Sequence, residues 1–171
     1  MRAPRWLRAL VLRFYPRLFA RIFTPDAREL GLVGEEFAVH ELLARGFVIV
    51  ARRVQTAHAE VDVLAREGRD LVCVEVKTTR YEPLPIPRGS GLDIRPARFR
   101  ESGRLGAVQT ARLVRAARAL RRGSDAVPRV DLVEVFLNAR SGAVKIEHRR
   151  NLTRKVEGPS RLGGRDLRES L

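Results

Sequence analysis

Four charged side chains interrupt two otherwise apolar runs near the middle of the chain. They are Glu60 and Asp62 in the stretch AEVDVLAR, and Glu75 and Lys77 in the stretch LVCVEVKTTR. Neighbouring side chains of a strand point to opposite faces, so the charged residues would share one face. The apolar residues would share the other: Val61, Val63, Val72, Val74 and Val76. The charged face is therefore either ordinary solvent-facing surface or a site.

Two carboxylates held close together favour a cation between them. Without one, their repulsion raises a pKa or costs stability. Mg²⁺ prefers oxygen ligands and keeps several waters, so two of these carboxylates with a backbone carbonyl form a plausible magnesium site. A metal there can polarise a phosphoryl oxygen and activate a bound water. Lys77, on the same face, can hold that water or offset charge in the transition state. The alternative is a common amphipathic hairpin with a wet side.

Helix and strand signals on both sides of this stretch indicate the elements that position it. Asp26 is a candidate helix cap, apolar residues follow it at helical spacing, and Gly46 would end the helix. Three strands are expected next, near 47–54, 59–65 and 71–78. The sequence therefore predicts a helix followed by a three-stranded meander.

The turn between the second and third strands decides which charged residues face each other. The loop 66–70 contains Gly68, and a turn centred on Glu67 and Gly68 would make these strands a hairpin. All four charged residues would then lie within reach of one point. The resulting cross-strand neighbours are Glu60 with Glu75 and Asp62 with Cys73.

The second half of the chain adds a basic helix and two more strands. Residues 81–104 are rich in Pro, Gly and Arg and are predicted to form a long loop. A helix over 105–122 would place Gln109 on its inner stripe, facing the sheet. Strands near 130–138 and 143–149 complete a mixed sheet. The fold class is therefore α/β.

Composition limits the kind of protein and its partners. The chain has 171 residues and is 44% hydrophobic, which suits one domain with a substantial core. A net charge of +14 favours a polyanionic partner, either nucleic acid or an acidic membrane surface. The single cysteine, Cys73, excludes a disulfide framework or a cysteine zinc site and fits a cytoplasmic location. The three histidines have no metal-ligand spacing.

The two ends of the chain differ from its middle. Residues 1–25 contain six arginines and no acidic residue, with apolar residues at helical spacing and Pro16 as a possible kink. Three interpretations of this basic amphipathic helix stay open: it packs on its own domain, anchors to a membrane surface, or contacts nucleic acid. Residues 26–152 would form the main domain, and 153–171 a disordered basic tail.

Four blocks in order resemble a known family. They are GLVGEE at 31–36, AEVDVL at 59–64, VEVK at 74–77 and RVDLV at 129–133. Asp62 followed by Glu75-Val76-Lys77 looks like the core of the PD-(D/E)XK nuclease superfamily. The blocks are similar to the YraN-like group within it, which resembles archaeal Holliday-junction resolvases. The resemblance spans about residues 31–152 and implies a restriction-endonuclease-like core.

The resemblance also implies a role for each matching residue. Asp62 and Glu75 would bind Mg²⁺ or Mn²⁺, Val76 would lend its carbonyl, and Lys77 would orient the attacking water. Glu35 would support the metal or its waters. Glu60 would be a supporting or alternative ligand, and Gln109 stands where the family usually has lysine. Ala59 replaces the family's glycine.

Two functional hypotheses follow from these residues. The first is a Mg²⁺-dependent endonuclease acting on branched or otherwise structured DNA, in which arginines contact phosphates. These arginines are Arg80, Arg112, Arg115 and Arg118. Related nucleases often work as dimers because two strands must be cut, so a homodimer is a further expectation. The second hypothesis is a non-catalytic nucleic-acid-binding or membrane-associated assembly factor that kept the fold.

Overall fold

A five-stranded mixed sheet forms the centre of the protein. The computed structural model describes residues 4–82, 105–121 and 129–155. The strand order follows the chain from β1 to β5, with β3 and β4 parallel and the other neighbouring pairs antiparallel. The strands are β1 (Val48–Gln55), β2 (Glu60–Glu67), β3 (Asp70–Tyr81), β4 (Arg129–Asn138) and β5 (Val144–Arg149). The predicted α/β class, with its helix, three-stranded meander, helix and further strands, is confirmed.

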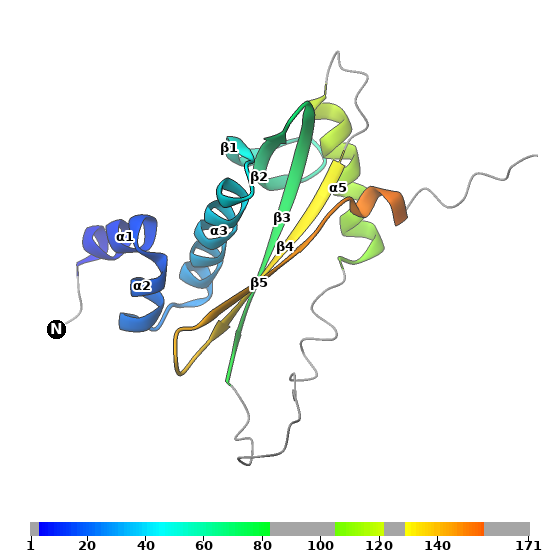
Figure 1. Ribbon diagram of the computed structural model, residues 1–171. Coiled ribbons are helices and arrows are strands. Elements are labelled where there is room, and N and C mark those ends of the chain that lie inside the picture. Colours follow the sequence, from blue (N-terminus) through cyan, green and yellow to red (C-terminus); the bar gives the residue numbers. More distant parts are fainter. Residues whose placement is uncertain (1–3, 83–104, 122–128, 156–171) are drawn as a thin grey trace, which may run out of the picture.

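Two helices cover opposite faces of the sheet (Figure 1). One face packs against α3 (Ala27–Ala44), and the other packs against α5 (Ala107–Leu120). Covering both faces lets the central parallel pair bury nearly all of its side chains, as β4 does from Arg129 to Leu137. The apolar residues on the charged face of the hairpin lie under α5. They are Leu64 and Cys73, joined there by Val61.

The prediction that Val61 shares the core of Val63 is therefore wrong. Val61 packs with the α5 cluster, whereas Val63 packs with the α3 cluster. The charged face is also not an open wet surface, because α5 closes most of it. Near the acidic pair, Asp62 and Lys77 keep some exposure to solvent, whereas Glu75 is buried.

The turn of the β2–β3 hairpin differs from the predicted turn by one residue. Glu67 pairs with Asp70, so the turn consists of Gly68 and Arg69, with Gly68 at a φ of +57°. A positive φ at the first turn position suits glycine, and this explains why Gly68 lies there. Each cross-strand partner therefore shifts by two residues, which leaves the faces unchanged. Backbone pairing ends at Val63 with Val74, and the next position brings Asp62 to Glu75.

Helix α3 begins and ends at the predicted residues. Asp26 accepts a hydrogen bond from the Glu29 backbone N–H (2.8 Å), and the Glu29 side chain accepts one from the Asp26 backbone N–H (3.2 Å). This reciprocal capping box satisfies two backbone donors at the helix start. Gly46, with a φ of +83°, ends the turn that follows the helix.

Two glycines of α3 provide a matched pair of stability predictions. A Cβ at Gly34 would lie 1.7 Å from Thr78 Oγ1 on β3, whereas a Cβ at Gly31 would meet nothing within 4 Å. We expect Gly34→Ala to lower the free energy of unfolding by about 1–3 kcal/mol through overpacking. Gly31→Ala should raise it by about 0.5–1 kcal/mol, because alanine is the better helix former. Urea titrations of both variants measure the two changes.

A second substitution tests the origin of the Gly34 effect. If the clash with the Thr78 side chain is the cause, Thr78→Ala should recover part of the stability lost in Gly34→Ala. Equal destabilisation with and without Thr78→Ala would contradict this close packing of α3 on β3.

The N-terminal segment forms two short helices that pack on the domain. Helices α1 (Arg5–Phe14) and α2 (Pro16–Ile22) meet at Tyr15, so the expected single helix is broken and not merely kinked. Proline lacks the backbone N–H that would continue a helix, and it disfavours helical geometry in the residue before it. Leu12 and Phe19 are buried in the α3-side core.

Two ion pairs fix these helices to α3. Arg8 donates to Glu29 in a bidentate pair (2.9 and 2.6 Å), and Arg13 donates to Glu36 (3.1 Å). The contacts support the interpretation in which the segment packs on its own domain. After β5, the 3₁₀ helix η1 (Leu152–Lys155) ends the described part of the chain. The loop predicted at 81–104 begins too early, because Tyr81 still belongs to β3. Residues 83–104 and most of the predicted tail lie outside the described residues.

Candidate functional site

The structure brings Asp62, Glu75, Lys77 and Gln109 together where β2 and β3 separate. Asp62 Oδ2 accepts a hydrogen bond from the Val76 backbone N–H (2.7 Å). Glu75 Oε1 accepts one from Gln109 Nε2 (2.7 Å) and lies 2.8 Å from Lys77 Nζ. The acidic pair is therefore held by its own hairpin, and α5, which covers the same face, fixes the Glu75 carboxylate through Gln109.

The pKa of Asp62 reflects this confined position. Burial, then the charge of Glu75 and more weakly that of Glu35, raise the pKa of Asp62 to about 6. The Val76 N–H and Lys77 act in the opposite direction but do not compensate. The carboxyl group is thus destabilised in its charged form, which is the condition that a bound cation relieves.

Glu35 reaches the site from α3. Its side chain is 12% exposed and lies 3.8 Å from Arg52 Nη2. Burial is the main cause of its raised pKa, which Arg53 and Arg52 partly oppose. Because the charge of Glu35 contributes to the raised pKa of Asp62, the two carboxylates influence each other electrostatically.

Glu60 lies apart from the acidic pair. Its carboxylate accepts a hydrogen bond from Arg53 Nε on β1 (3.2 Å). Hydrogen bonds from Gln55 and then Arg53 lower its pKa. The prediction that Glu60 lies opposite Glu75 is wrong, because the turn at Gly68 shifts the register of the hairpin by two residues. Glu60 thus faces the β1 edge of the sheet.

The predicted phosphate-contacting arginines fall into two groups. Arg112, Arg115 and Arg118 are exposed on α5. None of the three forms an ion pair with another residue in the described parts of the chain. Arg80 lies three residues beyond Lys77 on β3, and strand alternation places it on the opposite face. The structure therefore does not bring Arg80 together with the arginines of α5.

The donor set fits a hydrated divalent cation in part. Asp62 and Glu75 supply carboxylate oxygens, and Val76 lies between Glu75 and Lys77 with its carbonyl available to the same strand end. Within the described residues, no group of three or more Asp, Glu, His or Cys side chains is arranged to hold a metal ion. Mg²⁺ keeps several waters and is often held by one or two carboxylates, so a site with two carboxylates does not require a third acidic side chain.

Sequence reasoning missed a buried polar network around Asp131, which pairs in register with Val74 and so lies on the opposite face of the sheet from Glu75. Asp131, with no exposed surface, accepts hydrogen bonds from Arg129 Nε (2.8 Å) and Nη2 (2.7 Å) and from the Asn151 backbone N–H (2.8 Å). His148 Nε2 lies 2.8 Å from it, and Arg129 also pairs with Glu67. The available signal was an aspartate in the apolar strand VDLVEV. The network joins β2, β4, β5 and the start of η1.

These features define an α/β protein with an acidic pair and a lysine on the central hairpin of its sheet. Residues 34–135 match the uncharacterised protein family UPF0102, and this chain belongs to that family. The matched region includes the acidic pair, Lys77 and Gln109. The YraN-like part of the resemblance is therefore confirmed.

Relatives from several bacteria support the same membership. A UPF0102 protein of Caldicellulosiruptor saccharolyticus is 32% identical over 71% of this chain and 93% of its own length. A UPF0102 protein of Symbiobacterium thermophilum is 37% identical over 64% of this chain and 83% of its own. A third, from Dictyoglomus turgidum, is 43% identical over 60 residues, 35% of this chain and about half (51%) of that relative.

Proposed function

We propose that this protein is a metal-dependent nuclease that hydrolyses phosphodiester bonds in DNA, including branched or structured DNA. The observation that carries the proposal is the pair Asp62 and Glu75, with Lys77 Nζ 2.8 Å from Glu75 Oε1. The order of these residues also resembles the PD-(D/E)XK pattern. Mg²⁺ or Mn²⁺ would be held by Asp62, Glu75 and the Val76 carbonyl.

The residues of the site have separate roles in this proposal. A bound divalent cation would polarise a phosphoryl oxygen and lower the pKa of water. Lys77 orients the attacking water and offsets the negative charge that develops in the pentavalent transition state. Gln109 holds Glu75 in place through its 2.7 Å hydrogen bond. The exposed arginines of α5, with Arg112 among them, bind the phosphates that flank the scissile bond.

One observation favours a second candidate function. Lys77 pairs directly with Glu75, so the charge of that carboxylate is already compensated without a metal ion. A protein that kept the fold for binding alone could retain this ion pair. The alternative is therefore a non-catalytic nucleic-acid-binding or assembly factor.

A cleavage and binding panel tests the proposal. Purified protein is incubated with labelled four-way junction, flap and duplex DNA in Mg²⁺, Mn²⁺ or EDTA. We expect cleavage only with metal and none from Asp62→Asn/Glu75→Gln. Lys77→Met should lower the rate by about 100-fold while keeping Mn²⁺ binding measured by calorimetry, since lysine stabilises the transition state and not the bound ion.

A charge-matched variant controls for nonspecific loss of activity. Asp70→Asn/Glu41→Gln removes two negative charges from the exposed hairpin turn and from α3, away from the acidic pair. It should cleave like the unmodified protein. Salt-sensitive DNA binding without metal binding or cleavage would favour the non-catalytic alternative, and cleavage by the Asp62→Asn/Glu75→Gln variant would remove these residues from the mechanism.

A further inference from the structure

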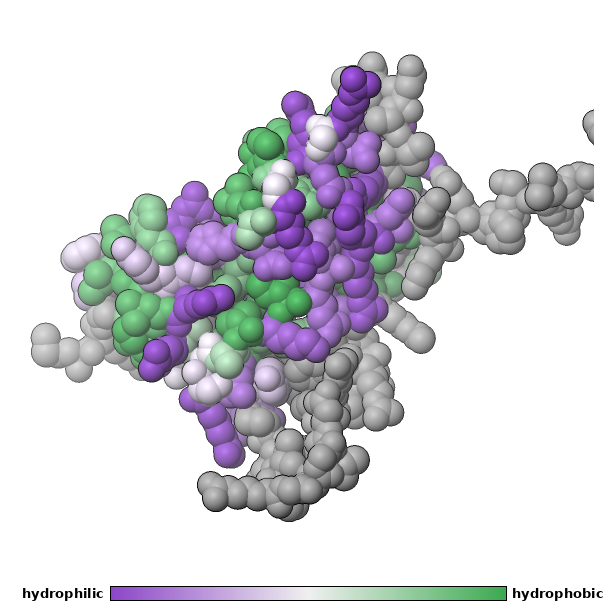
Figure 2. Space-filling model, in the orientation of Figure 1, coloured by the Kyte–Doolittle hydropathy of each residue, from purple (hydrophilic) through white to green (hydrophobic). Residues whose placement is uncertain are grey.

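The N-terminal helices carry most of the exposed large apolar side chains in the described parts of the chain. Six of these ten residues lie on α1, α2 and the residue between them. Figure 2 shows apolar side chains gathered over these helices at the left of the molecule. The six are Trp6, Leu10, Phe14, Tyr15, Leu18 and Ile22. An exposed patch of this kind marks an interaction surface.

The patch is not a poorly packed part of the core. Trp6, Leu10 and Phe14 are spaced by four residues and so form one stripe along α1, with 68%, 49% and 63% of their surfaces exposed. The same helix buries Leu12 in the core beneath it. Helix α1 is thus apolar on two sides, and only one of them packs against other residues that the structure describes.

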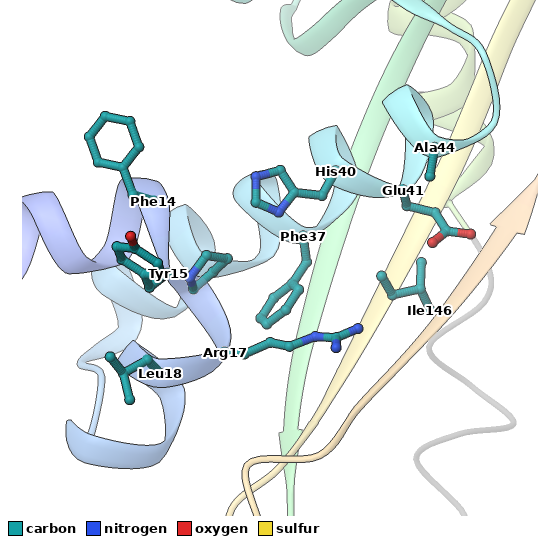
Figure 3. A pocket seen from close by; sticks show the side chains of 10 residues that line it. Phe14, Tyr15, Arg17, Leu18, Phe37, His40, Glu41, Ala44 and Ile146 are labelled. Atoms are coloured by element: carbon teal, nitrogen blue, oxygen red, sulfur yellow. The ribbon is translucent and has the colours of Figure 1, made fainter.

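A hollow of about 490 Å³ continues the apolar surface between α2, α3 and β5. Pro16, Phe37 and Ile146 line this hollow. Figure 3 shows Arg17 extending from α2 across it toward Ile146. Phe14 and Tyr15 lie at the edge nearest α1. The exposed stripe and the hollow therefore adjoin each other.

Basic side chains accompany this apolar surface. The segment 1–25 has six arginines and no acidic residue. Arg8 and Arg13 are engaged with Glu29 and Glu36, which fixes the helices in place. Arg17 and Arg21 are exposed and form no ion pair with any residue that the structure describes. Positive charge therefore stays available on α2, the helix that follows the stripe in the chain.

We propose that α1 and α2 dock this protein onto an anionic phospholipid bilayer. The Trp6, Leu10 and Phe14 stripe inserts into the boundary between headgroups and acyl chains, while Arg17 and Arg21 contact lipid phosphates. Tryptophan and tyrosine favour this boundary because their rings are apolar with a polar edge. None of the described helices is long and apolar enough to cross a bilayer, so the helices lie on the surface.

Charge selects this partner over two others. A second copy of the chain would bring Arg17 and Arg21 toward like charges on a molecule of net charge +14. Nucleic acid offers phosphates but no hydrocarbon layer for the stripe. An anionic bilayer satisfies both the apolar and the basic parts of the surface.

The single tryptophan makes the test direct. Trp6 is the chain's only tryptophan, so its fluorescence reports on the stripe alone. With vesicles of phosphatidylcholine and phosphatidylglycerol, we expect a blue shift and quenching by brominated acyl chains, and little change with phosphatidylcholine alone. Leu10→Ser/Phe14→Ser should weaken binding by about tenfold or more. Arg17→Gln/Arg21→Gln should weaken it by about tenfold at low salt.

Matched variants separate docking from the general attraction of a basic protein. Leu43→Ser/Val48→Ser changes two exposed apolar residues elsewhere, and Arg66→Gln/Arg69→Gln removes two exposed arginines of the β2–β3 hairpin. Both should bind vesicles like the unmodified protein. An equal loss of vesicle binding in these control variants, or no shift of Trp6 fluorescence with anionic vesicles, would overturn the proposal. So would a dimer in light scattering that Leu10→Ser/Phe14→Ser converts to a monomer.

Discussion

Replacing Asp62 by asparagine is expected to stabilise the metal-free protein at pH 8 and to abolish metal-dependent cleavage. The folded state raises the pKa of Asp62 from an ordinary value of 3.8 to about 6, so folding favours the protonated form. The contribution of the protonated Asp62 carboxyl to the free energy of unfolding is complete below the ordinary pKa and is lost as pH rises through about 6. Asparagine imitates the neutral form at every pH and still accepts the Val76 hydrogen bond.

The size of the gain follows from the pKa shift. After allowance for partial solvent screening, Asp62→Asn should raise the free energy of unfolding at pH 8 in EDTA by about 1–2 kcal/mol. The difference should vanish near pH 4. The same variant should cleave DNA about 100-fold more slowly or worse, because a bound metal contributes several kcal/mol to the transition state.

Metal addition supplies the control for this prediction. Mn²⁺ at saturating concentration should raise the melting temperature of the unmodified protein and leave that of Asp62→Asn unchanged, because only the former has the complete ligand set. If Asp62→Asn is less stable than the unmodified protein in EDTA at pH 8, the inference that the charged Asp62 destabilises the metal-free protein is contradicted. A gain in stability from Mn²⁺ by Asp62→Asn as large as that of the unmodified protein would contradict the role of Asp62 as a metal ligand.

Asp131→Ala is expected to cause the largest loss of stability among single substitutions in the described sheet. Asp131 is fully buried and accepts hydrogen bonds from Arg129 and Asn151, with His148 Nε2 at 2.8 Å. Truncation would leave the buried Arg129 with Glu67 as its remaining partner. Breaking a buried pair in this way costs about 3–5 kcal/mol. Urea unfolding followed by circular dichroism measures the loss.

Two comparisons identify the origin of that loss. Glu41→Ala breaks an i,i+4 pair with Arg45 on the surface and should cost less than about 0.5 kcal/mol. Burial raises the pKa of Asp131, but hydrogen bonds from His148, Arg129 and Asn151 outweigh it and hold the pKa below its ordinary value. The unmodified protein should therefore exceed Asp131→Asn in free energy of unfolding by the full amount above pH 4, and this difference should shrink as pH falls further. A cost as small as that of Glu41→Ala would show that the network is dispensable.

Local signals were enough to predict most of the fold. The cap at Asp26, the glycine at Gly46 and the alternation in β2 and β3 are determined by neighbouring residues, and each element appeared where it was expected. The proximity of Asp62, Glu75 and Lys77 followed from alternation on one hairpin. Gln109 faces the sheet as expected, because it lies on the inner stripe of its helix, and its contact with Glu75 is an addition from the structure.

Features that depend on a single turn or on distant residues were not predictable in this way. The register of the hairpin depends on which residue takes the positive φ at Gly68, and two adjacent choices look similar in sequence. The partners of Asp131 come from Arg129, His148 and Asn151, so no local pattern joins them. The contact of Arg13 with Glu36 likewise needs the packing of α1 on α3.

The parallel pair β3–β4 also has a consequence for the order of folding. These strands are neighbours at the centre of the sheet although residues 82–128 separate them in sequence. Closing so long a loop costs chain entropy before any contact offsets it, whereas the β2–β3 hairpin closes over Gly68 and Arg69 alone. We therefore expect the hairpin to form early and β4 to join late. Asp62 and Glu75 would then approach each other in the folding nucleus, before α5 brings Gln109 to cover them.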